Sequence, residues 1–314
     1  MASNPVINMF KVKELRSRLF FTILVLAIFR LGSVLTIPGI DANVLFKYFN
    51  DLASQNKNAF ASYMDFFVGG AFSNFSIFML GVMPYISTQI VMQLAVIIFP
   101  SLKRVVQEDG GQRKLATWTR IGTIFVCLLQ SYAVTVYAGS IPGCILLDPR
   151  WKFNALAMLT VTTGSMVTVW LGDQITARGI GNGISLIIFG GIIARLPSAC
   201  HEIFIKLQEG TMSFVTLILF VIFAVLVIIG IIEIQQGQRR IPVQYAKRVV
   251  GRKMYGGQST HIPLKVNQAG VIPVIFAMSF LQFPLTITYF MSADSATAMW
   301  ITKWLSPAGS PGVW

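Results

Sequence analysis

Charged residues are scarce in this sequence: Asp, Glu, Lys and Arg together make up 12% of its 314 residues. Soluble globular domains contain about twice that fraction, so the chain has no room for a soluble domain of ordinary composition. Hydrophobic residues make up 54% of the chain. They are gathered into runs of about 20 residues, the length that a helix needs to cross a bilayer. The composition therefore predicts an all-α, polytopic membrane protein.

Cysteine and histidine are also rare, with three and two residues, and no C-x-x-C spacing occurs. Cys127 falls within a hydrophobic run. Cys144 and Cys200 fall on one predicted side of the membrane, where a bridge is conceivable and unpaired thiols are the favoured interpretation. His201 and His261 are predicted to lie on opposite sides. We therefore expect no metal site.

Signatures of catalysis are missing as well. There is no P-loop, no H-E-x-x-H and no G-x-S-x-G motif. The run RGIGNGIS (178–185) superficially resembles a dinucleotide-binding loop, but it joins two hydrophobic runs and follows no strand, so a tight glycine turn is expected. Arg30 is the one ionisable residue well inside a run, with Arg195 and Glu233 near run ends. This scarcity disfavours a membrane enzyme or an ion-driven pump, and we expect no cofactor.

Seven hydrophobic runs are predicted to be membrane-spanning helices. They cover residues 19–37, 75–99, 121–138, 154–172, 184–199, 213–234 and 269–290. A shorter apolar segment, MDFFVGGAFSNF (64–75), leads directly into the second run, with which it shares Phe75. It is interrupted by Gly69 and Gly70. A helix of about 12 residues reaches only about 18 Å, whereas the hydrocarbon core is about 30 Å thick. This segment is therefore expected to be a half-helix.

Lys and Arg are unevenly distributed between the connectors. Of the 25 such residues, 17 fall in the N-terminal tail and the connectors 101–120, 173–182 and 235–268, and six in the alternate connectors. This bias predicts that the tail and those three connectors are cytoplasmic. Connector 235–268 carries more cations than topology requires. It is either a docking surface for an acidic partner or RNA, or a polybasic loop for anionic lipid headgroups, and the residues alone leave both open.

Five motifs identify a family. They are FRLGS…IPGID, LGVMPYIS, WLGDQITARGIGNGIS, GQRRIPVQYAKR and STHIPLKVNQAGVIP, in this order along the chain. Together they resemble the SecY family of bacterial and plastid protein-conducting channels. The resemblance implies a pseudo-twofold helical bundle of ten spanning helices, of which this chain matches the first seven. Residues 1–199 would form the N-terminal half, with five helices and the half-helix, and 200–314 part of the C-terminal half, with the docking loop at 235–268.

The resemblance also implies the sites of a channel interior. A ring of aliphatic side chains narrows the pore in this family, and the matching positions are Val82, Ile86, Ile184, Ile188 and Ile275. A short plug seals the pore beside the ring, and the matching segment is Met64, Asp65, Phe66, Phe67, Val68, Gly69, Gly70, Ala71 and Phe72. The half-length of the apolar segment fits such a plug, and a re-entrant anchor that never moves is the alternative.

A lateral gate and a docking surface follow in the same way. The matching gate positions are Ser87, Gln130, Asn267 and Phe283. The matching positions for docking of the ribosome and the motor ATPase SecA are Arg239, Arg240, Lys247, Arg248, Arg252 and Lys253. The further partners implied are the small subunits SecE and SecG, an unfolded preprotein or signal sequence, and the lipid bilayer.

The implied function is passage of unfolded secretory proteins across the membrane and release of membrane helices through the gate, without enzymatic chemistry. The implied location is the bacterial cytoplasmic membrane, or alternatively the plastid thylakoid membrane, with the N-terminus in the cytoplasm. A secondary transporter is the competing class, and it predicts charged or carbonyl ligands converging near the membrane midplane. A structural fragment without activity of its own is a third possibility.

Overall fold

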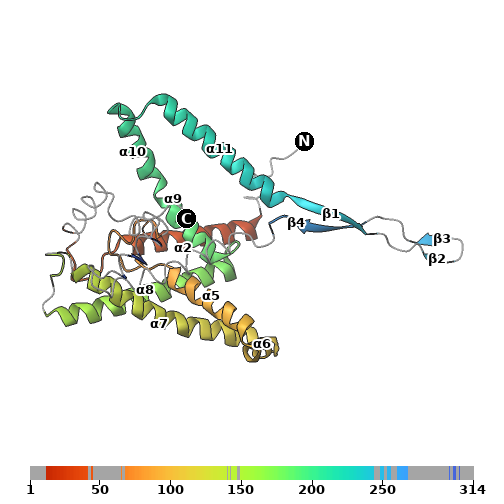
Figure 1. Cartoon of the computed structure of the whole chain (residues 1–314), viewed down its shortest axis with the longest axis horizontal. Helices are drawn as coiled ribbons and strands as arrows, with labels where there is room; N and C mark the ends of the chain where they lie inside the picture. The colour runs from red at the N-terminus through yellow and green to blue at the C-terminus, as the bar shows by residue number, and fades with distance from the viewer. Residues whose placement is uncertain are drawn as a thin grey trace. The chain divides into compact units, whose positions relative to one another are not determined.

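The computed structural model describes most of the chain in two compact units (Figure 1). The described residues are 12–41, 65, 68–139, 141, 143–146, 149–243, 248–250, 253–255 and 260–267, with isolated positions at 44, 297, 300, 301 and 304. One unit is Met1–Ser198 with Met278–Trp314, and the other is Ala199–Ala277. That the chain divides at 199/200 into the halves of a pseudo-twofold fold stays a prediction.

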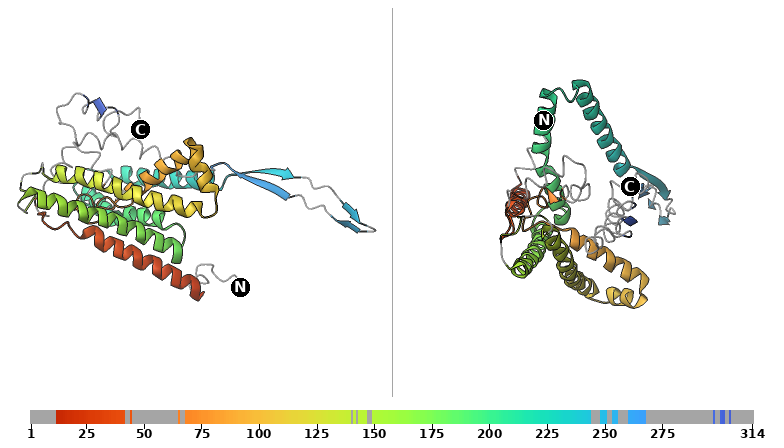
Figure 2. Two further views of the ribbon diagram at one scale, coloured as in Figure 1. Left: turned by 90° about the horizontal axis from the view of Figure 1, so that it is seen from below. Right: turned by 60° about the vertical axis from the view of Figure 1, so that its left-hand side comes forward.

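The first unit is a bundle of helices, most of which are apolar. Its helices are α2 (Lys13–Val34), α5 (Met83–Ile98), α6 (Pro100–Gln107), α7 (Gly111–Gly139), α8 (Arg150–Arg178) and α9 (Gly183–Ala194). Helix α8 packs against α7, α9 and α2, and α5 packs against α7 (Figure 2). Half of the apolar window of α8 is buried, the largest share among the candidate spans of the described residues. This helix therefore lies at the centre of the unit.

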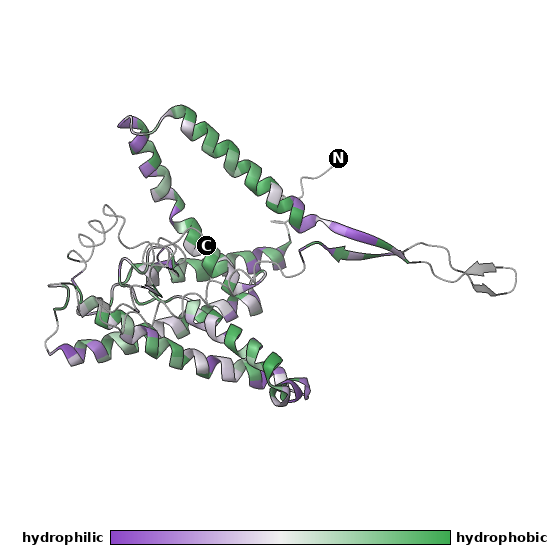
Figure 3. Ribbon diagram, viewed as in Figure 1, coloured by the Kyte–Doolittle hydropathy of each residue, from purple (hydrophilic) through white to green (hydrophobic). Residues whose placement is uncertain are grey.

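The second unit contains most of α10 (Leu196–Gln208), then α11 (Phe214–Gln236) and two antiparallel ribbons. Helix α11 is apolar over most of its length, up to Ile232, and none of its residues is buried (Figure 3). A helix that is hydrophobic all round belongs inside a protein or in lipid, so α11 is suited to a bilayer. One ribbon pairs β1 (Gln238–Val243) with β4 (Thr260–Lys265), and the other pairs β2 (Arg248–Val250) with β3 (Lys253–Tyr255).

The predicted helical membrane fold is confirmed. Among the described residues, α2, α7, α8, α11 and the α9–α10 pair are each long and apolar enough to span a membrane. A sixth candidate is α5 with α6, which are bent by 104° at Phe99 and Pro100. The bend is expected because proline disfavours helical backbone in the residue before it. The seventh predicted run, 269–290, lies outside the described residues.

The second predicted span, 75–99, begins later than expected. Residues 75–82 form turns, and the helix starts at Met83 with Pro84 in its first turn. Phe75 has a φ of 42° and Gly81 a φ of 54°, and such left-handed backbone cannot continue an α-helix. The apolar run is thus a folded entry segment followed by a helix of 16 residues.

Connectors predicted to share a side of the membrane lie together in the structure. The amide of Leu146 donates to the carbonyl of Gly39, and Ile40 pairs with Ile145, so the connector after α2 meets the one before α8. Near the middle of α2, the Thr22 hydroxyl accepts a hydrogen bond from the amide of Ile180 in the predicted glycine turn. In that turn Gly181 has a φ of 69°, as a turn that requires glycine predicts.

A hydrophobic core joins the first of these connectors to the end of the half-helix segment. Its buried members are Ile37, Ile40, Phe72, Phe75, Met79, Ala138, Ile141, Cys144, Phe153, Ala157 and Val161. Burial of a large apolar side chain such as Phe153 stabilises a fold by about 1.5–3 kcal/mol. This core fixes the point at which the segment enters α5.

Candidate functional site

The segment matched to the plug is folded against the bundle. Asp65 and Val68 have helical backbone, and a series of turns begins at Gly69. Gly69 and Gly70 have φ values of 68° and 91°, conformations that glycine adopts without strain. The expected half-helix therefore ends by Gly69. Met64, Phe66 and Phe67 lie outside the described residues.

The side chain of Asp65 organises this segment. Its Oδ1 accepts hydrogen bonds from the amides of Phe72 at 3.0 Å and Ser73 at 2.9 Å. Its Oδ2 accepts from the Ser73 hydroxyl at 2.6 Å and forms an ion pair with Arg195. The carboxylate is nearly buried, and a buried charge is tolerated where such partners surround it. Asp65 thus ties the start of the segment to its end.

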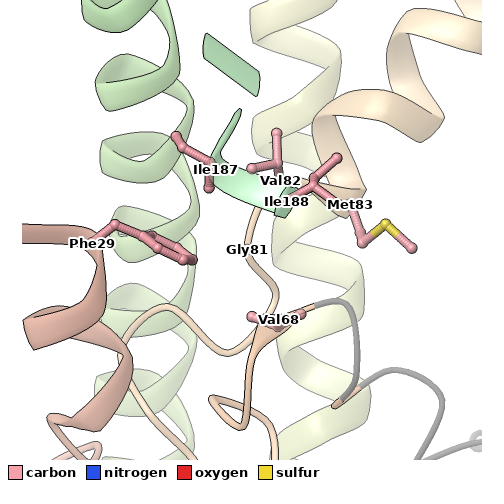
Figure 4. Close-up of a pocket in the computed structure, with 7 residues that line it drawn as sticks. All are labelled: Phe29, Val68, Gly81, Val82, Met83, Ile187 and Ile188. Atoms are coloured by element: carbon pink, nitrogen blue, oxygen red, sulfur yellow. The ribbon is translucent and has the colours of Figure 1, made fainter. Parts of the chain in front are cut away.

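Two of the five ring candidates meet next to this segment. Val82 and Ile188 line one small cavity, and Val68 lies on its wall (Figure 4). The full lining is Phe29, Val68, Gly81, Val82, Met83, Ile187 and Ile188. Every one of these residues is apolar, so the cavity offers no side-chain ligand to a polar solute. The structure therefore brings one ring candidate from the N-cap of α5 and one from α9 next to a residue of the plug segment.

The other ring candidates lie as follows. Ile86 is buried one turn after Val82 on α5, as the four-residue spacing predicts. Ile184 is partly exposed, and its Cγ1 lies 3.2 Å from the position of a Cβ added at Gly172, so it packs toward α8. Ile275 lies outside the described residues. The convergence of all five around one axis stays a prediction.

The gate candidates are spread over both units. Ser87 is buried on α5 and donates to the carbonyl of Met83 in its own helix at 3.0 Å, while Gln130 is partly exposed on α7. Asn267 follows β4 in the second unit, and Phe283 lies outside the described residues. The Ser87 hydroxyl therefore finds its hydrogen-bond acceptor within its own helix. It needs no hydrogen-bond partner on a helix across the gate.

The docking candidates lie in the two ribbons. Arg239 and Arg240 are exposed on β1, where they pair in register with Leu264 and Pro263 of β4. Arg248 begins β2 and Lys253 begins β3, whereas Lys247 and Arg252 lie outside the described residues. A ribbon holds cations along an extended backbone, which presents them at regular spacing. The sequence predicts a docking loop in this part of the chain, whereas the structure forms strands there.

No metal-binding cluster is found in the described part of the chain. No group of three or more His, Cys, Asp and Glu side chains there could hold a metal ion. The three cysteines are free, with Cys127 and Cys144 buried and Cys200 exposed. The apolar cavity and the plug segment beside it are therefore the features that indicate a function.

Comparison with solved structures gives the fold. A structure described as "The structure of a protein conducting channel" matches with a TM-score of 0.57 over 96% of this chain and 64% of that chain, at 17% identity. "Sec61 in the Canine ribosome-channel complex from the endoplasmic reticulum" matches with a TM-score of 0.58 over 96% of this chain, at 15% identity. At these identities the likeness shows the fold alone, which is that of protein-conducting channels.

Sequence comparison gives the family. The SecY family model matches residues 76–310. The protein translocase subunit SecY of Buchnera aphidicola is 44% identical over 294 residues, which cover 91% of this chain and 82% of that protein. The same subunit of Escherichia coli K12 is 43% identical over 91% of this chain. The chain belongs to the SecY family, as the sequence motifs predict, and it spans 66% of the length of the Escherichia coli relative.

Proposed function

We propose that this chain forms the central channel through which a Sec protein translocase passes unfolded secretory proteins across the membrane. The observation that carries the proposal is the apolar cavity that is lined by Val82, at the N-cap of α5, by Ile188 of α9 and by Val68 of the plug segment. Aliphatic walls fit around a moving polypeptide without offering it a polar site to which it would bind. When nothing occupies it, such a constriction excludes water and ions by dewetting.

The plug role rests on the same geometry. Val68, Ala71 and Phe72 are buried, and Val68 lines the apolar cavity, so the segment contributes one wall of it. A solved relative is described by the words "The plug domain of the SecY protein stablizes the closed state of the translocation channel and maintains a membrane seal". We infer that residues 64–72 do the same in this chain, that membrane helices leave through a lateral gate, and that the ring includes Ile86, Ile184 and Ile275.

We further propose that the channel performs no chemistry and takes its energy from partners at the cytoplasmic ribbons. Exposed Arg239 and Arg240 suit an acidic protein surface such as that of a motor ATPase, or ribosomal RNA phosphates. SecA, the ribosome, SecE and SecG are the expected partners. The charge distribution supports a cytoplasmic N-terminus, and we propose the bacterial inner membrane as the location.

A translocation assay tests this function against that of a solute transporter. The chain is reconstituted into liposomes with the small subunits, SecA and ATP, and a urea-unfolded secretory preprotein is added. We expect the preprotein to become protected from external protease, with the Escherichia coli relative as the positive control. Absence of protected preprotein, together with uptake of a small solute, would contradict the proposal and favour the transporter.

A further inference from the structure

Two arginines in the apolar segments of the first unit contact the plug segment. Arg30 lies in α2 between Phe29 and Leu31, and Arg195 lies at the break between α9 and α10. Placing a charged side chain at membrane depth is costly, so such residues are retained where they do specific work. Both arginines direct their guanidinium groups to the segment whose Val68 lines the cavity.

The contact of Arg195 is an ion pair with Asp65. The Arg195 Nη2 reaches Asp65 Oδ2, and the side chain of Asp65 is 7% exposed, against 35% for Arg195. The guanidinium also lies over the turn, since a Cβ added at Gly70 would be 3.7 Å from Arg195 Nη2. Arg195 therefore holds the one described carboxylate that organises the plug segment.

The contact of Arg30 is a hydrogen bond to the backbone. Its Nη1 donates to the carbonyl of Gly69 at 2.7 Å. On the same stretch of chain, a Cβ at Gly69 would lie 2.6 Å from the carbonyl oxygen of Gly191, so the plug backbone lies directly against α9. Gly191 lies on α9, four residues before Arg195, which follows the last residue of that helix. The two arginines thus hold Asp65 and Gly69 of the plug segment, one from α2 and the other from the residue that follows α9.

The other end of the segment is held in a different way. Phe72 and Phe75 belong to the hydrophobic core, the amide of Ile37 donates to the carbonyl of Phe75, and the amide of Ile77 donates to that of Leu35. This end is fixed by apolar burial and by backbone pairing with the chain that follows α2. Displacement of the part before Ala71 would leave these contacts intact.

We propose that Arg30 and Arg195 are a latch that positions the plug and releases it when the channel interior becomes wet. An ion pair is strong in a low-dielectric interior and weak in water, because the attraction falls as the dielectric constant rises. In the closed, dry channel the pair holds Asp65 in place. When a polypeptide and water enter, hydration of the two charges favours their separation. The latch deepens the proposed channel function and rests on it for its purpose.

Hydrogen exchange measures the latch without requiring translocation. The full chain is placed in lipid nanodiscs, and exchange is followed in peptides covering 65–76, which contain the amides of Gly70, Phe72 and Ser73 that bond to Asp65. We expect Arg195→Gln to speed their exchange by about tenfold, the effect of a tenfold larger open population. Arg195→Lys, which keeps the charge, is expected to restore most of the protection, and Arg30→Gln to act in the same direction as Arg195→Gln.

Two controls separate the latch from general destabilisation. Arg120→Gln breaks an ion pair with Asp173 that joins α7 to α8, and it should leave exchange in 65–76 unchanged. Asp65→Asn combined with Arg195→Gln should be no worse than the more severe single variant, because partners in one interaction are not additive. Wild-type exchange in Arg195→Gln would overturn the latch.

Ion conductance of the same variants in planar bilayers tests the link to channel function. Faster exchange with a higher leak supports both the latch and the sealing role. Faster exchange with no added leak supports the latch and contradicts the seal, so the two proposals fail in distinguishable ways. A leak that rises while exchange in 65–76 stays at the wild-type level would overturn the latch and assign the arginines a different role.

Discussion

At the residue scale, the two arginines in apolar segments make polar contacts that hold the plug segment. The sequence shows Arg30 and Arg195 as ionisable residues in or near predicted spans, which is the available signal of a role. Their partners could not be predicted, because Asp65 is 130 residues from Arg195 in sequence and the carbonyl of Gly69 is a backbone group. Only the folded chain brings these atoms together.

Cys144 and Cys200, the two cysteines on the predicted exterior side, differ in burial and are expected to differ in reactivity. Cys144 is fully buried in the connector before α8, and burial, with a contribution from the charge of Asp41, raises the pKa of its thiol above the ordinary value. At a given pH less of the reactive thiolate is then present. We expect a maleimide at pH 8 to modify exposed Cys200 readily and Cys144 at least about tenfold more slowly.

Mass spectrometry of the labelled, digested protein measures both sites at once. In denaturant the burial of Cys144 is lost, its pKa returns toward the ordinary value, and the two rates should converge. Rapid labelling of Cys144 in the native protein would show that the core around it is open.

At the scale of elements, the sequence predicts helices well and ribbons poorly. Long apolar runs located five of the predicted spans, because a helix of about 20 residues is the structure in which such a run satisfies its own backbone in lipid. The start of helix α5 could not be predicted from the apolar run, because Phe75 and Gly81 within that run adopt left-handed backbone. The strands in 238–265 were missed because the paired cations mask the alternation that marks a strand.

Reversing the charges on the β1–β4 ribbon tests its role in docking. Arg239→Glu together with Arg240→Glu should weaken binding of SecA or ribosomes by at least tenfold at about 0.15 M salt, since two attractive charges become repulsive. Membrane insertion should be unchanged. Co-sedimentation of proteoliposomes with each partner measures the affinity.

The matched control is another exposed, adjacent pair of cations. Arg113→Glu with Lys114→Glu, in the first turn of α7, changes the net charge by the same amount on the same predicted side. Equal loss of binding in both double variants would indicate a general charge effect and contradict docking at the ribbon.

At the scale of the whole molecule, family and fold agree. The order of five motifs is sufficient to identify the family, and the helical channel fold follows from that. The ring candidates do not all lie together among the described residues. Val82 and Ile188 line one cavity, whereas Ile184 packs toward α8. Isoleucine on a membrane helix packs equally well against lipid, a neighbouring helix or a pore, so sequence alone cannot assign it to one of them.

The most direct test of the channel proposal is cross-linking to a polypeptide halted during translocation. A photoreactive amino acid is placed at Val82 or Ile188, or, as a control, at Ile97, which is 74% exposed on α5. If Val82 and Ile188 line the path, both positions will form adducts with the halted preprotein and Ile97 will not. Adducts at Ile97 with none at Val82 and Ile188 would contradict the account.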